Sequence, residues 1–318
     1  CDSFGKTKRI DDALGQYAVF LKEKLPKNLS LDGMKLALDC AHGASYKLAP
    51  KVFAELGAEL VLQAVEPNGK NINDNCGALH PENLSKLVQQ EACDLGFCFD
   101  GDADRLIAID EKGEILDGDE IIAICAIYYS QAKRLKDNRV VTTVMSNLGL
   151  EKALEKNGIT LERTAVGDRY VVEKIKKEGL SLGGEQSGHL IFHDSSTTGD
   201  GVLAALCLLE VVLRSKKPLS VLRHSMQKLP QVLESFQVSQ KIPLDNLPSL
   251  KKLLKDTEKE LLGRGRILFR YSGTENKARL MLEGEDKTLI RKMAKEIKTL
   301  AISLLTKSSK SRETEASL

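Results

Sequence analysis

The order of apolar and amphipathic segments is the feature of this chain that most restricts its fold. Apolar, strand-like runs at residues 34–40 and 59–65 and another beginning at residue 94 are separated by segments with helical spacing at 46–56 and 81–92. Strands that alternate with helices are typical of a parallel β-sheet covered by helices. We therefore expect the first large unit of this chain to be an α/β domain.

The same order of segments recurs in the next part of the chain. Helix-like residues 119–137 precede a strand at 139–145, and the alternation continues up to a glycine-interrupted strand at 180–192. Aligning the two copies by their last helices places GEQSGHLIF over DGDADRLIA, which indicates an internal duplication. Ligands of open α/β sheets bind outside the carboxyl ends of the strands, where both loops fall. Gly167 and Asp168 are expected to cap the helix that begins at Arg169.

The segments beyond residue 215 are shorter and differently ordered. Lys216, Lys217 and Pro218 interrupt an apolar helix, and a strand near 232–238 then precedes a helix, two strands and a final helix. The predicted fold is α/β, with two successive three-layer α/β/α domains of related topology followed by a smaller α+β C-terminal domain.

Composition argues against several classes of function. Lys and Arg number 47 against 45 Asp and Glu, and the resulting net charge of +2 argues against a nucleic-acid partner. No apolar run approaches the 18 residues that a membrane-spanning helix needs. The seven cysteines are scattered and include no CxxC pair, so we expect reduced thiols in a cytoplasmic protein.

Three carboxylates at alternate positions, Asp100, Asp102 and Asp104, stand between two apolar runs. Alternate residues of an extended or looping backbone point the same way, and Gly101 and Ala103 are too small to obstruct them. Three converging carboxylates repel one another unless a cation lies among them. Oxygen ligands of this kind suit Mg²⁺ or Ca²⁺, and a site with few protein ligands suits Mg²⁺ better.

Three other interpretations of this stretch remain open. Asp and Gly are common in purely structural turns. The spacing is also that of a calcium loop with Glu111 at its twelfth position, but Arg105 occupies the sixth position, where glycine is needed. A phosphatase with Asp100 as its nucleophile is the third interpretation. The third carboxylate and Arg105 favour a cation site.

The glycine-rich stretch at residues 183–189 is the second candidate loop. Its glycines allow the backbone to approach a ligand, while Glu185 and Ser187 can bond neighbouring sugar hydroxyls. Because imidazole in general titrates near neutrality, His189 could act as a general acid or base, although a lone histidine more often only forms a structural hydrogen bond. A plain hairpin turn is the alternative for the whole stretch.

A third candidate loop, RYSGTENKAR, lies between the last two predicted strands. The guanidinium groups of Arg270 and Arg279, the hydroxyls of Ser272 and Thr274, and the flexible backbone at Gly273 are the groups that a phosphate pocket requires. A basic surface hairpin is the alternative.

Taken together, the three loops resemble those of a known enzyme family. DGDADR, GEQSGH and RYSGTE, in that order, resemble the metal, sugar and phosphate loops of the α-D-phosphohexomutase superfamily, and residues 5–305 resemble its second, third and fourth domains. The motifs EPNGKNIN, VGDRYV and TTGDG resemble the bacterial phosphoglucosamine mutase branch. That resemblance implies interconversion of glucosamine 6-phosphate and glucosamine 1-phosphate through a phosphoserine and a 1,6-bisphosphate, on the route to UDP-N-acetylglucosamine and peptidoglycan.

The resemblance also implies a role for each matching residue. Asp100, Asp102 and Asp104 would hold Mg²⁺, and Arg105 would be catalytic by steadying the phosphoryl group. The residues that would bind the phosphosugar substrate are Glu185, Ser187, Arg270, Ser272, Gly273, Thr274 and Arg279. His189 is the other candidate catalytic residue, on the chemistry of its imidazole and not on the resemblance. The resemblance implies no nucleic-acid or membrane partner, and it allows a homodimer.

Two departures from the family pattern affect the expected activity. Asn276 stands where the family usually has proline. The nucleophilic serine of the family lies in an Asn-Pro loop of a first domain, and no Asn in this sequence precedes Pro. We therefore expect a C-terminal part of the enzyme that is inactive alone. A phosphomannomutase or phosphoglucomutase sibling, a sugar-phosphate-binding module and a phosphatase remain alternatives.

The expected domain boundaries follow from these motifs. They are residues 1–25 for a linker helix left from the missing first domain, 26–116 for the metal-binding domain, 117–225 for the sugar-binding domain, 226–307 for the phosphate-binding domain, and 308–318 for a disordered tail.

Overall fold

A computed structural model of the chain describes residues 10–306, and the predicted tail at 308–318 lies outside them. The chain divides into two compact units: residues up to Ser146 together with Leu150–Gln227, and Asn147–Gly149 together with the residues from Lys228 onward. Within 10–306, no helix is both long and apolar enough to cross a membrane.

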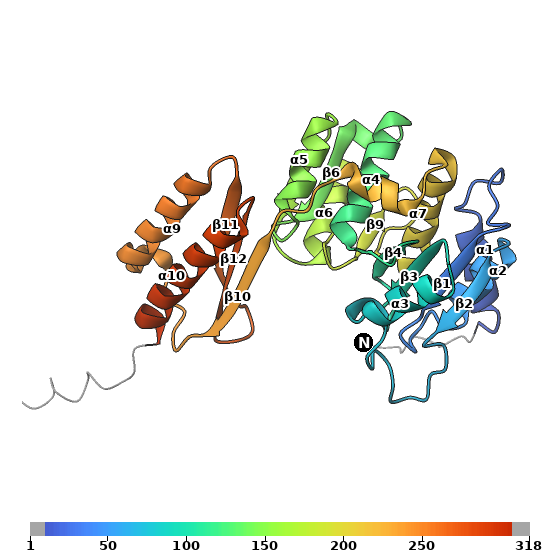
Figure 1. Cartoon of the computed structure of the whole chain (residues 1–318), viewed down its shortest axis with the longest axis horizontal. Coiled ribbons are helices and arrows are strands. Elements are labelled where there is room, and N and C mark those ends of the chain that lie inside the picture. The colour runs from blue at the N-terminus through green and yellow to red at the C-terminus, as the bar shows by residue number, and fades with distance from the viewer. Residues whose placement is uncertain (1–9, 307–318) are drawn as a thin grey trace, which may run out of the picture. The chain divides into compact units, whose positions relative to one another are not determined.

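The first unit begins with a mixed five-stranded sheet in the order β2-β1-β3-β4-β5 (Figure 1). Strands β1, β2 and β3 run parallel, whereas β4 and β5 are antiparallel additions at one edge. The strands are β1 (Lys35–Asp39), β2 (Glu59–Gln63), β3 (Leu95–Phe99), β4 (Leu106–Asp110) and β5 (Ile115–Leu116), and the accompanying helices are α1 (Ala13–Lys22), α2 (Leu48–Glu55), η1 (Gly77–Leu79) and α3 (Glu82–Gln90).

A second sheet in the same unit repeats this plan in the order β7-β6-β8-β9. Here too, three parallel strands carry an antiparallel fourth strand at the edge. The strands are β6 (Arg139–Thr143), β7 (Thr160–Thr164), β8 (Leu182–Gly184) and β9 (Leu190–Phe192), and the helices are α4 (Gly118–Gln131), η2 (Lys136–Asn138), α5 (Leu148–Lys156), α6 (Asp168–Glu178), α7 (Gly201–Ser215), α8 (Leu219–Leu222) and η3 (Arg223–Ser225). The related topology predicted from the repeated segments is confirmed.

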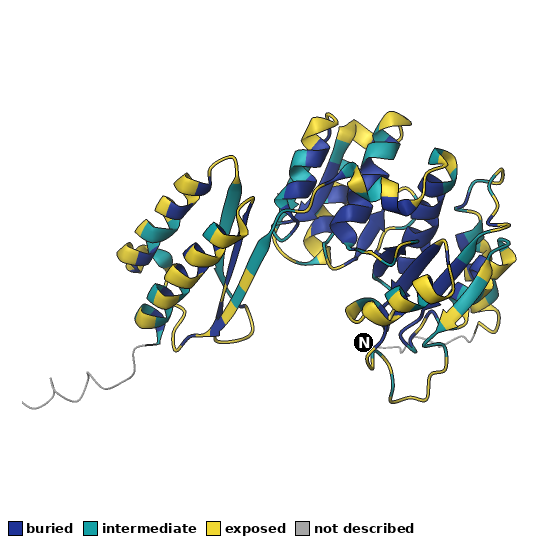
Figure 2. Ribbon diagram, in the orientation of Figure 1, coloured by how far each residue is buried: buried dark blue, intermediate teal, exposed yellow. Residues whose placement is uncertain are grey.

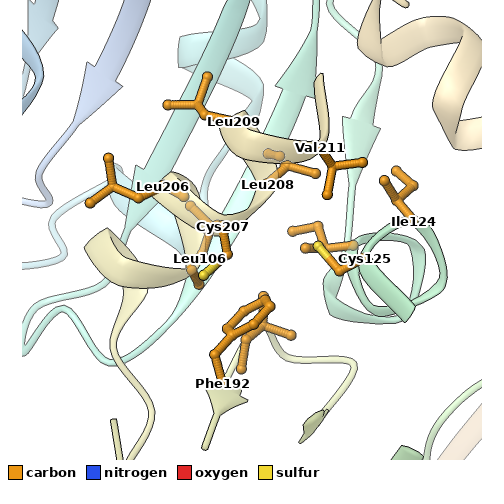
Figure 3. Packing of buried hydrophobic residues seen from close by; sticks show 14 of the residues in the cluster. Leu106, Ile124, Cys125, Phe192, Leu206, Cys207, Leu208, Leu209 and Val211 are labelled. Carbon is orange, nitrogen blue, oxygen red and sulfur yellow. The ribbon is translucent and has the colours of Figure 1, made fainter. Parts of the chain in front are cut away.

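The helices α4 and α7 are buried on nearly every side, because strands of both sheets contact them. Helix α4 packs against β4 and β8, and α7 packs against β3, β4 and β9 as well as against α4. Burial is nearly continuous along both helices in Figure 2. Figure 3 shows Cys207 and Leu208 of α7 gathered with Leu106 of β4, Cys125 of α4 and Phe192 of β9. A helix without a polar face is stable only when buried in this way.

The second unit contains a three-stranded antiparallel sheet in the order β10-β12-β11. Two helices pack against this sheet, as Figure 1 shows, and enclose a separate apolar core that includes Leu250, Leu280 and Ile297. The elements are β10 (Gln231–Gln237), η4 (Leu244–Asn246), α9 (Pro248–Leu261), β11 (Gly265–Tyr271), β12 (Lys277–Gly284) and α10 (Lys287–Leu305).

Two details of the secondary structure differ from the sequence-based predictions. Both sheets are mixed rather than wholly parallel: β4 pairs antiparallel with β3 in the first sheet, and in the second the segment expected as one strand at 180–192 turns back on itself as the hairpin β8–β9. The helix expected at 119–137 ends at Gln131.

Candidate active site

Two of the three candidate loops follow equivalent strands of the first unit. The loop at residues 100–105 joins parallel strand β3 to its antiparallel neighbour β4, and the loop at 185–189 joins β8 to β9 in the same way. Both loops therefore leave the carboxyl ends of parallel strands, which is where α/β sheets bind their ligands.

The three aspartates of the first loop converge. One carboxylate oxygen each of Asp100, Asp102 and Asp104 lies within 4.8 Å of the other two. Asp100 is 7% exposed, Asp104 is half-buried and Asp102 is open to solvent. The loop turns sharply at Ala103, whose φ is 63°, and the backbone N–H of Arg105 donates to Asp100 Oδ1 at 3.1 Å.

The electrostatics of this cluster favour a cation. The pKa of Asp100 is raised to about 6 by burial and by the neighbouring carboxylates of Asp104 and Asp102, against a lowering hydrogen bond from the Arg105 backbone. Arg105 Nε lies 3.5 Å from Asp100 Oδ2 and 3.7 Å from Asp104 Oδ1. Asp104 Oδ1 is buried and accepts no hydrogen bond from the described residues. One guanidinium beside three carboxylates leaves negative charge that a divalent ion would offset.

The aspartate loop also packs through its backbone against the loop that follows β1. Ala44, in the loop after β1, donates its N–H to the carbonyl of Gly101 at 2.8 Å. A Cβ on Gly43 would lie 2.2 Å from that same carbonyl oxygen, so only glycine allows this approach. The carboxyl ends of β1 and β3 are thus joined directly, which fixes the position of the aspartates.

The second loop packs against the first through its backbone. Leu106 donates its N–H to Gly188 O at 3.0 Å, and Arg105 and His189 form an antiparallel β-bridge. Glu185 Oε1 accepts the N–H of Gly167 at 3.0 Å, and Ser187 is exposed. The loop that carries the glutamate and serine expected to contact a sugar is therefore joined through its backbone to the end of the aspartate loop.

His189 is buried and linked to that cluster. It is 4% exposed, and its Nδ1 lies 3.0 Å from Asp104 Oδ2. Its Nε2 has no hydrogen-bond partner among the described residues and lies 4.0 Å from Asp168 Oδ2. A Cβ on Gly199 would lie 2.3 Å from that nitrogen, so the glycine leaves the ring its space. This geometry allows His189 to orient the Asp104 carboxylate.

Asp168 is a residue whose place the sequence did not indicate. Of the two residues expected to cap α6, Gly167 occupies the N-cap position, whereas Asp168 is the first residue of the helix and no side chain caps it. Its carboxylate is exposed beside His189. The signal that could have found it is its position after β7, at the same edge of the sheet as the loop that follows β8.

The third loop lies within the second unit, between β11 and β12. Arg270 and Arg279 are paired directly across the two strands, an arrangement of like charges that is unfavourable without an anion. Burial and then the charge of Arg279 lower the pKa of Arg270. Ser272 is 5% exposed, whereas Gly273 and Thr274 are exposed and a Cβ on Gly273 would meet nothing within 4 Å. The predicted phosphate-binding groups thus share one open turn.

Comparison with protein-family models places the whole arrangement among known enzymes. The models for α/β/α domain II, α/β/α domain III and the C-terminal domain of phosphoglucomutase/phosphomannomutase match residues 15–113, 117–229 and 233–300. The three matches follow one another in the order that the family's domain numbers require.

Curated relatives are similar over most of this chain. The phosphoglucosamine mutase of Citrifermentans bemidjiense is 52% identical over 296 residues, which cover 93% of this chain and 65% of the relative. The phosphoglucosamine mutase of Myxococcus xanthus is 52% identical over 293 residues, covering 92% and 64%. The chain thus spans about two thirds of the length of these relatives.

Solved structures show the same fold at low identity. A phosphoglucomutase/phosphomannomutase family protein from Burkholderia thailandensis matches with a TM-score of 0.74 at 22% identity, covering 91% of this chain and 64% of that one. Aspergillus fumigatus N-acetylphosphoglucosamine mutase, in complex with GlcNAc-6P and magnesium, matches with a TM-score of 0.71 at 18% identity, covering 91% and 69%. Family models, relatives and fold agree, and the chain belongs to the phosphoglucomutase/phosphomannomutase family.

Proposed function

We propose that this chain is part of a phosphoglucosamine mutase, which interconverts glucosamine 6-phosphate and glucosamine 1-phosphate in the cytoplasm for the synthesis of UDP-N-acetylglucosamine. The observation that carries the proposal is the convergence of three carboxylates in a loop that pairs through its backbone with the loop of Glu185 and Ser187, both at the carboxyl ends of parallel strands. The names of the relatives that are 52% identical support glucosamine phosphate as the substrate.

The acidic cluster fits a magnesium ion. Its ligands are carboxylate oxygens, and the buried Asp104 Oδ1 has no hydrogen-bond donor among residues 10–306. Asp100, Asp102 and Asp104 would hold the ion, and when bound it would neutralise charge on the oxygens of the transferred phosphoryl group.

The remaining groups of the first unit would position the reactants. The guanidinium of Arg105 would bind the phosphoryl group beside the cluster, because it can donate to two oxygens at once. Glu185 and Ser187 would bind the hydroxyls of the sugar. His189 would keep the Asp104 carboxylate in place through its Nδ1.

The turn of the second unit would bind the phosphate that is not being transferred. Arg270 and Arg279 would share its charge, which removes the repulsion between their guanidinium groups. Ser272, Gly273 and Thr274 would donate hydroxyl and backbone N–H groups to its oxygens. Holding the distal phosphate positions the sugar for transfer at its other end.

The chemistry would proceed as two phosphoryl transfers. A phosphoserine would give its phosphoryl group to the free sugar hydroxyl, forming the 1,6-bisphosphate, and the reoriented bisphosphate would return its other phosphoryl group to the serine. No Asn-Pro loop of the kind expected around that serine occurs in this sequence. The binding groups described here can therefore be tested separately from turnover.

Calorimetric titration of the 318-residue chain with glucosamine 6-phosphate in Mg²⁺ tests the proposal. We expect saturable binding that Arg270→Gln and Asp102→Asn each weaken, and a preference over glucose 6-phosphate and mannose 6-phosphate. Turnover is expected only when an upstream segment carrying the serine is supplied. Binding that neither substitution changes would contradict the proposed site, and an equal affinity for all three sugars would contradict the proposed substrate.

A further inference from the structure

Residues 238–242 are held beside the turn that joins β11 to β12. Val238 donates its N–H to Asn276 O at 2.9 Å, and the hydroxyl of Tyr271 donates to Ile242 O at 2.6 Å. These two hydrogen bonds flank Lys241 on both sides along the chain. The backbone of Lys241 is therefore fixed next to the turn, although η4 begins only three residues later.

The side chain of Lys241 extends over that turn. Its Nζ donates to Gly273 O at 3.4 Å, and the residue is exposed. An ammonium group has three N–H donors, so a single carbonyl leaves two of them available. The four-carbon stem also allows the charge to move toward an anion bound at the turn.

Lys241 differs from its neighbours in having no acidic partner. Lys277 pairs with Glu275 at 2.6 Å, and Lys298 pairs with Glu234 at 2.7 Å. Among residues 10–306, no carboxylate pairs with Lys241, and its ammonium hydrogen-bonds to the carbonyl of Gly273. The turn thus gathers the charge of Lys241 in addition to that of the two arginines.

We propose that Lys241 is a third cationic ligand of the phosphate pocket formed by Arg270 and Arg279. The inference rests on the proposed function, because it adds a residue to the same phosphate-binding turn. A phosphate dianion carries more charge than one guanidinium offsets, and Arg279 is itself 3.5 Å from Glu275. Lys241 supplies a mobile positive charge that closes on the dianion from the 238–242 segment.

The hydrogen bond from Val238 also gives Asn276 a place in this pocket. Asn276 stands where the resembling family usually has proline, and its carbonyl anchors the segment that carries Lys241. Asn276 therefore supports the pocket through its backbone carbonyl, whereas the positive charge that a bound phosphate contacts belongs to Lys241.

The test measures the dissociation constants of glucosamine 6-phosphate and of inorganic phosphate for the 318-residue chain and its variants. We expect Lys241→Met and Lys241→Gln each to weaken both ligands about fivefold, the effect of one exposed charge pair. Lys241→Arg should restore most of the affinity. Lys252→Met, which removes an exposed charge from α9 of the same unit, should leave both constants within twofold of the original.

The outcomes separate this inference from the proposed function. If the unaltered chain binds neither ligand, or if Arg270→Gln binds them as tightly as the unaltered chain, the phosphate pocket itself is wrong. If the chain binds both ligands and Arg270→Gln weakens them, but the Lys241 variants match the original, only the role of Lys241 is overturned. Equal losses in the Lys241 and Lys252 variants also overturn it, since they would reveal a general effect of net charge.

Discussion

Replacing Gly188 by alanine, which adds one methyl group, should destabilise the packing of the two candidate loops. The φ of Gly188 is +94°, and an added Cβ would lie 2.3 Å from the carbonyl oxygen of Leu106. The same glycine accepts the N–H of Leu106 at 3.0 Å, so the two backbones have no room to separate without losing that bond. Gly158 offers a matched control, because its φ is +70° and nothing lies within 4 Å of the added Cβ.

The difference between these two glycines can be expressed as free energies of unfolding. Alanine in left-handed backbone costs about 1–2 kcal/mol, a cost that both substitutions share. At Gly188 the collision with backbone adds about 1–3 kcal/mol, and the loss of the hydrogen bond adds about 1 kcal/mol. We therefore expect Gly158→Ala to lower the free energy of unfolding by about 1–2 kcal/mol and Gly188→Ala to lower it by about 3–6 kcal/mol.

Urea unfolding followed by circular dichroism would measure both losses, with Mg²⁺ titration of the folded variants as a second readout. Since Gly188 precedes His189, which contacts Asp104, the Gly188 variant should also bind Mg²⁺ more weakly, whereas the Gly158 variant should bind it normally. Equal losses of stability in the two variants, or unchanged Mg²⁺ affinity in Gly188→Ala, would refute the close packing of the two loops.

Three further predictions concern charge and burial. Because the folded pKa of Asp100 is raised to about 6, this group favours folding at low pH and loses that contribution as the pH rises through 6; Mg²⁺ should therefore raise the melting temperature at pH 7.5 and not at pH 5. Arg223→Met should cost about 3–5 kcal/mol in urea unfolding, because it leaves the buried carboxylates of Asp110 and Glu120 without their shared guanidinium. Burial raises the pKa of the Cys40 thiol to about 12, and all six described cysteines are buried, so a thiol reagent should modify them only after unfolding.

The sequence predicted the fold class because its strongest signals are local. Apolar runs and helical spacing mark most of the strands and helices, and the repeated order of segments indicated two related domains. The direction of the last strand in each sheet has no such signal. Whether a glycine-rich run such as 180–192 continues or reverses depends on tertiary pairing with Leu106 and its neighbours, which spacing does not encode.

The candidate site likewise contains features that the local sequence predicts and contacts that depend on tertiary packing. Asp100, Asp102 and Asp104 are close in sequence, so their convergence followed from the backbone alone. The contact between His189 and Asp104 joins residues 85 apart in sequence and arises only when two domains pack. The approach of Lys241 to Gly273 likewise depends on how the chain before η4 is held against a hairpin, which periodicity does not describe.

The duplicated topology determines how the aspartate cluster is held. In each sheet a hairpin after the third parallel strand carries one of the candidate loops, acidic in one copy and glycine-rich in the other. The two hairpins then pair with each other through the bridge of Arg105 with His189 and the hydrogen bond between Leu106 and Gly188. Backbone pairing is directional and leaves little freedom for sliding. The position of the carboxylates is therefore set jointly by both hairpins. A substitution that loosens the second hairpin should weaken the binding of a cation even though it removes none of the three carboxylates.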